Sequence, residues 1–339
     1  MQTFAARKQE VIDGQAARKI FGLISTEMSL VEAEYQRQAA SNVEVINYLG
    51  DYLRASGGKR IRPALLILSS IASGGRGDTD SIIRMATVME MLHTATLVHD
   101  DIIDNADLRR NRTSVNARFG NQAAVLMGDW LYMSAFETSL KQRSLEILDI
   151  LIRLTRKMTE GELIQMTRIG DLAISEDQYF DILKRKTAYL FSGCCEIGAM
   201  LSGAALSQRA ALRDYGMNLG IAFQLADDTL DFTSDQEVMG KAAGADLLEG
   251  KMTLPLIRLI HIDRSVRGIL EKVIDTGIYS DETRSNVNSR LFAHGILEDT
   301  KRIALEYAET ARKSLDVFPE TEYRSALDAI PNFVVQRNK

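Results

Sequence analysis

Residues 94–104 have the sequence TATLVHDDIID. The apolar positions before them recur every three or four residues, as on a buried helix, and three carboxylates follow: Asp100, Asp101 and Asp104. Residues three and four apart are neighbours on an α-helix, so these side chains are predicted to lean toward one face. Like charges crowded in this way repel one another unless a cation lies between them, and a hard divalent cation takes oxygen ligands. The stretch therefore predicts a metal site at a helix end.

The same spacing occurs a second time in residues 223–231, FQLADDTLD, at Asp227, Asp228 and Asp231. Gln224 shares their helix face, and His93 lies two helical turns before the first aspartate cluster. Two helices that each end in three carboxylates are expected to face each other across one cavity that holds two or three divalent ions. Magnesium fits such an all-oxygen site better than zinc, for which the chain has no Cys/His set.

A basic, glycine-containing segment predicts which anion the metal ions neutralise. Residues 56–63, SGGKRIRP, place Lys59, Arg60 and Arg62 at the start of a helix after two glycines. Backbone amides, a positive helix end and basic side chains together form a phosphate or diphosphate site, although the Walker pattern is missing. Further donors of this kind follow both aspartate clusters: Arg109, Arg110, Arg112, Lys186, Thr187, Lys241 and Lys251.

The rest of the chain has the pattern of an all-α protein. No proline occurs between residues 63 and 255, which is typical of long helices and rare in proteins with many turns. The helical period predicts helices at residues 82–96, 147–166, 178–206 and 210–232, with polar loops at 105–121 and 234–250. Only residues 332–336 have the pattern of a short strand. We expect one all-α domain at residues 19–339 after a charged N-terminal lead, residues 1–18.

Composition narrows the class of protein further. The 339 residues carry a net charge of −5, which argues against non-specific nucleic-acid binding. No apolar run is long enough for a transmembrane segment, and the first ten residues lack the apolar stretch of a signal peptide. The two cysteines, Cys194 and Cys195, are adjacent and poorly placed to bridge each other. These features favour a cytoplasmic protein.

In their order along the chain, these motifs closely resemble the trans-isoprenyl diphosphate synthases, or polyprenyl synthetases. The resemblance covers residues 45–260 and rests on these segments: 57–63 (GGKRIRP), 100–104 (DDIID) with 109–110 (RR), 186–187 (KT), 223–231, 240–241 (GK) and 246–255 (DLLEGKMTLP). It implies roughly a dozen helices around a central cavity and a homodimer. It also implies the substrates, isopentenyl diphosphate and an allylic diphosphate such as farnesyl diphosphate.

The resemblance implies a role for each matched residue. All six aspartates would bind magnesium, and Asp100, Asp101, Asp104, Lys186, Asp227 and Asp228 would be catalytic. The positions that grip isopentenyl diphosphate are matched by Lys59, Arg62, His93 and Arg110. Those on the allylic substrate are matched by Arg109, Lys186, Thr187, Gln224, Lys241 and Lys251. The reaction would be ionisation of the allylic diphosphate, condensation with isopentenyl diphosphate and loss of a proton.

Product length is expected to depend on the helix before Asp100. Short-chain members of the family resemble this region with aromatic residues four and five positions before that aspartate, whereas this chain has Thr96 and Ala95. Small residues predict an open tunnel and a product of C30 to C50, with octaprenyl favoured. A geranylgeranyl or farnesyl diphosphate synthase, or a class I terpene cyclase, stays as an alternative. The apolar segment around Trp130, residues 125–136, is a candidate dimer face.

Overall fold

The computed structural model describes residues 18–109, 112–233 and 244–336. Within these residues there are sixteen α-helices, somewhat more than the dozen expected, one π-helix, two short 3₁₀ helices and a pair of two-residue strands. The elements of the first half are α2 (Ser25–Ala39), α3 (Glu44–Ala55), α4 (Ile61–Ala72), α5 (Asp80–Ile103), β1 (Leu108–Arg109), β2 (Arg112–Thr113), α6 (Val115–Phe119), α7 (Asn121–Leu140) and α8 (Leu145–Met166). Those of the second half are α9 (Glu176–Leu183), η1 (Lys184–Ala188), α10 (Tyr189–Leu201), α11 (Leu206–Thr233), α13 (Ala245–Leu248), α14 (Leu254–Ile262), η2 (Arg264–Val266), α15 (Arg267–Thr276), α16 (Asp281–Ala293), α17 (Ile296–Lys313), η3 (Ser314–Val317) and α18 (Glu322–Gln336). The all-α prediction is confirmed.

Three local predictions differ from the structure. Residues 332–336 are the last turns of α18, where Val334 and Val335 are buried, so helix packing overrides their strand preference. The helix predicted at 178–206 ends at Leu201 and contains the π-helix η1 between α9 and α10. The two predicted loops hold short helices, α6 and α13, and the first also holds the antiparallel pair β1–β2.

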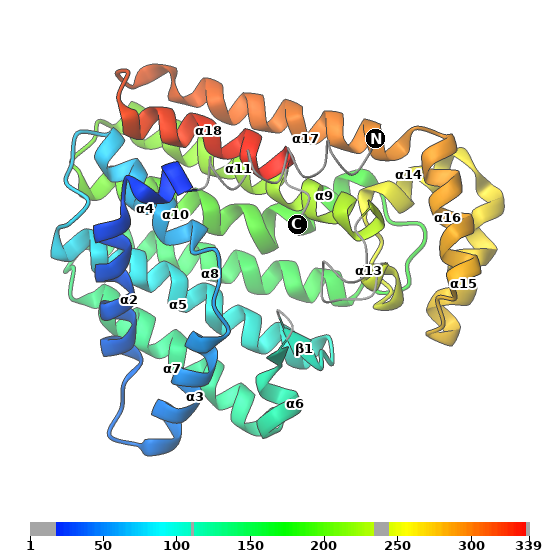
Figure 1. Ribbon diagram of the computed structural model, residues 1–339, viewed down its shortest axis with the longest axis horizontal. Helices are drawn as coiled ribbons and strands as arrows, with labels where there is room; N and C mark the ends of the chain where they lie inside the picture. Colours follow the sequence, from blue (N-terminus) through cyan, green and yellow to red (C-terminus); the bar gives the residue numbers. More distant parts are fainter. Residues whose placement is uncertain (1–17, 110–111, 234–243, 337–339) are drawn as a thin grey trace.

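The helices lie in layers around α10, which packs against α4, α5, α8 and α11. Figure 1 shows α17 and α18 along one side of the molecule, next to α11, and α7 on the other side, next to α5. The helices α15 and α16 form one end. The large apolar core joins α4, α5, α7, α8, α10 and the first half of α11. Within the described residues, no helix combines the length and apolarity that crossing a membrane requires.

Small residues allow α10 and α11 to approach each other closely, as their sequence predicts. A Cβ atom at Gly216 would lie 2.6 Å from the backbone oxygen of Phe191, and one at Gly220 would lie 2.5 Å from Cα of Ala188. A Cβ at Gly161 of α8 would likewise lie 2.6 Å from Cβ of Arg185 in η1. These close contacts place the π-helix directly against both α8 and α11.

Candidate active site

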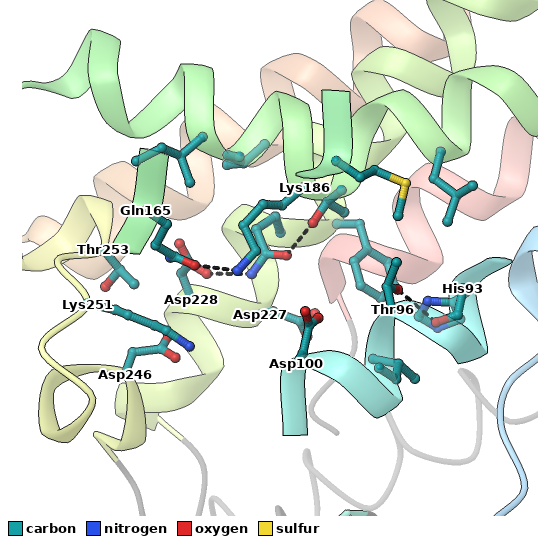
Figure 2. A pocket seen from close by; sticks show the side chains of 18 of the residues that line it. His93, Thr96, Asp100, Gln165, Lys186, Asp227, Asp228, Asp246, Lys251 and Thr253 are labelled. Atoms are coloured by element: carbon teal, nitrogen blue, oxygen red, sulfur yellow. Dashed lines mark hydrogen bonds between the residues drawn. The ribbon is translucent and has the colours of Figure 1, made fainter. Parts of the chain in front are cut away.

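The elements meet around one large cavity with a volume of about 720 Å³. Its walls come from the start of α4, from α5, α8, α9, η1 and α11, and from the segment that begins with α13. Figure 2 shows carboxylates of Asp100, Asp227, Asp228 and Asp246 in the same cavity as the ammonium groups of Lys186 and Lys251. Apolar side chains line it as well: Leu97, Met158, Ile182, Leu183, Leu190 and Phe223.

The three aspartates at the end of α5 have different surroundings. Asp100 lines the cavity, and burial raises the pKa of its carboxyl to about 6. Asp101 is 4% exposed, and its Oδ1 accepts hydrogen bonds from Nε and Nη2 of Arg109 at 2.8 and 2.5 Å. Asp104 accepts a hydrogen bond from Nζ of Lys251 at 2.8 Å. The expectation of one shared face is wrong for Asp101, because consecutive helical residues point about 100° apart.

The second aspartate cluster lies in the last turns of α11 and is more deeply buried. Asp227 and Asp228 line the cavity, while Asp228 and Asp231 are 3% and 6% exposed. Burial raises the pKa of both these carboxyls, and the nearby Asp246 raises it further. Oδ1 of Asp231 accepts a hydrogen bond from the backbone N–H of Ala245 at 3.3 Å, but its buried Oδ2 has no hydrogen-bond partner among the described residues.

A chain of hydrogen bonds fixes Asp228 from three elements. Tyr179 of α9 donates its hydroxyl to Oδ2, and Gln224 donates from Nε2 to Oδ1 at 2.8 Å. Thr187 of η1 in turn donates to Oε1 of Gln224 at 2.9 Å. Burial raises the pKa of Tyr179 well above its usual value, so the hydroxyl keeps the proton that it donates. We therefore expect these hydrogen bonds to hold Asp228 in one orientation before any ligand binds.

The π-helix η1 points Lys186 into the cavity. Its ammonium forms an ion pair with Glu162 of α8 at 2.5 Å and donates a hydrogen bond to Gln165, also of α8. Glu162 occupies a position of the helical apolar stripe predicted for residues 147–166, and this half-buried charge was the available signal for a site on α8. π-helical turns are frequent at functional sites, where they change the direction in which side chains point.

Lys251 is held in a similar way between two carboxylates. It donates to Asp104 at 2.8 Å and to Glu249 at 2.6 Å. Burial lowers the pKa of Lys251, but the two carboxylates more than offset this, so its pKa is raised and the ammonium stays charged. On the α4 side, Lys59, Arg62 and His93 line the cavity. The site is therefore rich in fixed charges of both signs.

Residues 43–288 match the sequence model of the family described as polyprenyl synthetase. The chain belongs to the polyprenyl synthetase family. It is 38% identical over 324 residues to octaprenyl diphosphate synthase of Escherichia coli. The aligned region covers 95% of this chain and 99% of that protein. The fold is similar to that of a Caulobacter crescentus polyprenyl synthase solved with calcium and isoprenyl diphosphate, with a TM-score of 0.90, 36% identity and 95% and 98% of the two chains covered. A decaprenyl diphosphate synthase of Rhodobacter capsulatus gives a TM-score of 0.88 at 32% identity, with 95% and 99% covered.

Membership of the polyprenyl synthetase family makes the protein a prenyltransferase, and most of the predicted site residues lie around its cavity. Arg110 and Lys241 are outside the described residues. Five residues of the site were not predicted from the sequence as functional: Glu162, Gln165, Tyr179, Asp246 and Glu249. Asp246 and Glu249 belong to a segment that was quoted for its resemblance to the synthetases, but their direction toward the site depends on how α13 folds back onto α11.

The two predicted product-length positions of this synthetase differ in their surroundings. Thr96 lines the cavity, and its hydroxyl is satisfied by the backbone oxygen of His93 at 2.8 Å. Ala95 is fully buried in the apolar core. It lies one turn before His99, whose Nε2–H donates a hydrogen bond to the backbone oxygen of Val125 in α7. Helical spacing therefore puts Ala95 on the α7 side of α5 and Thr96 on the cavity side.

The Caulobacter polyprenyl synthase was solved with calcium, a divalent cation. Among the described residues, no three His, Cys, Asp or Glu side chains converge on one point as in an all-protein cage. The carboxylates instead lie singly around the cavity, and Oδ2 of Asp231 is a buried oxygen that lacks a hydrogen-bond partner within the described residues. Magnesium is usually bound in this manner, through one or two carboxylates, waters and substrate phosphates. The residues therefore fit such an ion.

Proposed function

We propose that the protein is a long-chain trans-polyprenyl diphosphate synthase, which extends an allylic diphosphate with isopentenyl diphosphate. The observation that carries this proposal is that charged and apolar side chains line the same cavity. Carboxylates and fixed cations suit diphosphates and their magnesium ions, and apolar side chains such as Met158 and Leu190 suit a hydrocarbon chain. Relatives named for octaprenyl and decaprenyl products support the long-chain assignment, with a product of C30 to C50.

Two groups of basic and polar residues bind the two substrates in this proposal. The isopentenyl diphosphate residues are Lys59, Arg62, His93 and Arg110. The allylic diphosphate residues are Arg109, Lys186, Thr187, Gln224, Lys241 and Lys251. Ion pairs with carboxylates already hold Arg109, Lys186 and Lys251 in place, so little side-chain entropy is lost when a diphosphate binds.

Two or three magnesium ions belong to the proposal, with Asp100, Asp101, Asp104, Asp227, Asp228 and Asp231 as their candidate ligands. When bound, magnesium neutralises the diphosphate and so assists its departure. The hydrogen bonds of Tyr179 and Gln224 keep Asp228 in a fixed direction, and Asp231 has one oxygen without a hydrogen-bond partner among the described residues. Asp101 already binds Arg109, so its first role is to aim that guanidinium.

The reaction follows from these placements. The allylic C–O bond breaks, and Lys186, Lys251 and Arg109 stabilise the charge that develops on the departing diphosphate. The double bond of isopentenyl diphosphate attacks the allylic cation, one C–C bond forms and one proton leaves. The departing diphosphate is the proposed proton acceptor. The apolar lining, with Phe223 and Leu190, keeps water from the cation.

Extension of farnesyl diphosphate tests this function. With magnesium and radiolabelled isopentenyl diphosphate, we expect label in products of C30 to C50 when they are separated by length. Label that stops at C20 would assign a shorter-chain synthase instead. No incorporation would contradict the synthase proposal, and a cyclic hydrocarbon formed from farnesyl diphosphate alone would favour a terpene cyclase.

A homodimer is also part of the proposal, and α7 and α8 offer the face for it. On α7, Leu126, Met133 and Leu140 are 68%, 62% and 51% exposed and seven residues apart, so they lie on one side of the helix. The neighbouring helix α8 exposes Leu145 and Ile152 with the same spacing. Contiguous exposed apolar residues of this kind mark interaction surfaces.

The dimer prediction is tested by molar mass in solution. We expect light scattering to give twice the chain mass for the unchanged protein, and a double variant with Leu126→Glu and Met133→Glu to be a monomer. Ile278→Glu, which makes one substitution of the same kind at a residue 67% exposed after α15, serves as the control and should stay dimeric. A monomeric unchanged protein would refute this part of the proposal.

We also propose a cytoplasmic location for the protein. The buried, unbridged thiols of Cys194 and Cys195 support it, because they fit a reducing compartment.

A further inference from the structure

The loop that carries Lys59 and Arg62 has an unusual backbone. Gly57 has a φ of +66°, and Arg60, which precedes α4, has a φ of +48° and a ψ of +36°. Glycine adopts this left-handed region freely, but a residue with a Cβ atom does so at a cost. Among the residues that the structure describes, no side chain caps the start of α4 by a hydrogen bond. Such a conformation persists only where surrounding contacts hold it.

The side chain of Arg60 supplies those contacts. Its Nη1 donates to Oε1 of Glu90 at 2.7 Å, and its Nε donates to Oε1 of Glu32 at 2.6 Å. The guanidinium carbon lies 5.7 Å from the centre of the Tyr35 ring. The Arg60 side chain is only 14% exposed and that of Glu90 only 4%. The Arg60 side chain is therefore held by contacts inside the protein at the edge of the cavity. In the sequence it lies between Lys59 and Arg62, which are proposed to bind isopentenyl diphosphate.

Glu90 connects this loop to the helix of the first aspartates. It lies in α5, one turn before His93 and ten residues before Asp100. It also lines the cavity together with Lys59, Arg62 and His93. The carboxylate is thus in contact with the loop through Arg60 and is part of the element that carries both His93 and Asp100.

We propose that Glu90 is a positioning residue for isopentenyl diphosphate: it holds Arg60 in its left-handed conformation and so aims Lys59 and Arg62 into the cavity. This proposal rests on the function proposed above. Glu90 itself need not contact the substrate, and a carboxylate would repel a diphosphate if it did. Its effect passes through the Arg60 guanidinium, with Glu32 as a second, more exposed anchor, 41% exposed. The described allylic residues lie on β1, η1, α11 and the segment after α13, and none of them belongs to this loop.

A merely structural ion pair would give a different result from a positioning one. Removal of one partner of a buried pair destabilises a protein wherever the pair lies. It changes the KM for one substrate and not for the other only if the pair orients the groups that bind that substrate. The discriminating measurement is therefore the ratio of the two KM values, measured beside the melting temperature.

Glu90→Gln is the first variant, because it keeps the shape and the acceptor oxygen and removes the charge. We expect the KM for isopentenyl diphosphate to rise about 10-fold or more, since small misplacements of binding groups have effects of this order. The KM for farnesyl diphosphate should stay within about twofold, because that substrate binds elsewhere in the cavity. Glu32→Gln loosens the same guanidinium from its exposed side and should show the same pattern more weakly. It also provides a test if the first variant fails to fold.

A double-mutant cycle shows whether Glu90 acts through Arg60. If it does, a protein with both Glu90→Gln and Arg60→Met should have the same KM for isopentenyl diphosphate as Arg60→Met alone. The control is Asp328→Asn, which removes the carboxylate that binds Arg312 between α17 and α18. It should lower the melting temperature and leave both KM values unchanged.

The possible results distinguish failure of this positioning role from failure of the proposed synthase function. An unchanged protein that incorporates no isopentenyl diphosphate contradicts the proposed function. An active unchanged protein, with both KM values unaltered or raised equally in Glu90→Gln, refutes the positioning role. Additive effects in the double-mutant cycle would also refute it, because Glu90 would then act independently of Arg60.

Discussion

Replacement of Asp100 by asparagine is expected to lower kcat about 1,000-fold, the loss that follows removal of one group that stabilises developing charge. Asparagine keeps the size of the side chain but removes the negative charge that would hold a divalent cation beside the departing diphosphate. Steady-state incorporation of labelled isopentenyl diphosphate, at saturating concentrations of both substrates, measures the effect.

The same substitution should not destabilise the protein. Burial raises the pKa of Asp100 to about 6, so the folded state favours the protonated form more than the unfolded state does. The ionised carboxylate therefore costs stability above the unfolded pKa, and this cost reaches its full size above about pH 6. Asparagine removes it, so the melting temperature at pH 8 should be equal or higher.

A matched control makes the Asp100 result specific. Asp275→Asn makes the same chemical change at an exposed position of α15, and it should leave both kcat and the melting temperature unchanged. A near-normal kcat in Asp100→Asn would contradict the assignment of Asp100. A large fall in its melting temperature would instead attribute lost activity to misfolding and contradict the predicted gain in stability.

Thr96→Tyr is expected to shorten the product from C30–C50 to C20 or less. Thr96 lines the cavity beside the apolar side chains of Leu97 and Met158, so a phenol ring there would occupy space proposed for the growing chain. The rate of the first condensation should change little, because the substitution leaves the diphosphate-binding groups untouched. Separation of the labelled products by length measures the effect.

Two further variants keep the product-length result interpretable. Thr96→Ala should leave the product as long as before or longer, because it removes volume from the same wall. Ala95→Tyr places the ring in the closed core toward α7 and should mainly lower the melting temperature, since overpacking there displaces helices. Unchanged product length in a folded Thr96→Tyr protein would refute the role of Thr96.

The features that the sequence predicted correctly are those that depend on local periodicity. The long helices α5, α8 and α11 follow from apolar spacing of three and four. The close packing of α10 on α11 follows from small residues such as Gly216 and Gly220. These signals are written in neighbouring residues, so a single sequence contains them.

The features that it did not predict depend on contacts between distant segments. The π-helix at Lys184–Ala188 lies against Gly161 of α8, and nothing within the helix itself requires it. Asp101 turns to Arg109 because β1 folds back beside α5. Residues 332–336 have a strand preference that packing against the core overrides. Glu162 is an exception among these features, because the sequence alone shows a charge at an apolar position of the helix.

The central claim is that one cavity binds both diphosphates and joins their hydrocarbon parts. The most direct test measures inorganic pyrophosphate and labelled product in the same reaction, with farnesyl diphosphate, isopentenyl diphosphate and magnesium. We predict one pyrophosphate released for each isopentenyl unit incorporated, and no release above background when isopentenyl diphosphate is omitted. Equal release of pyrophosphate with and without isopentenyl diphosphate would contradict the claim.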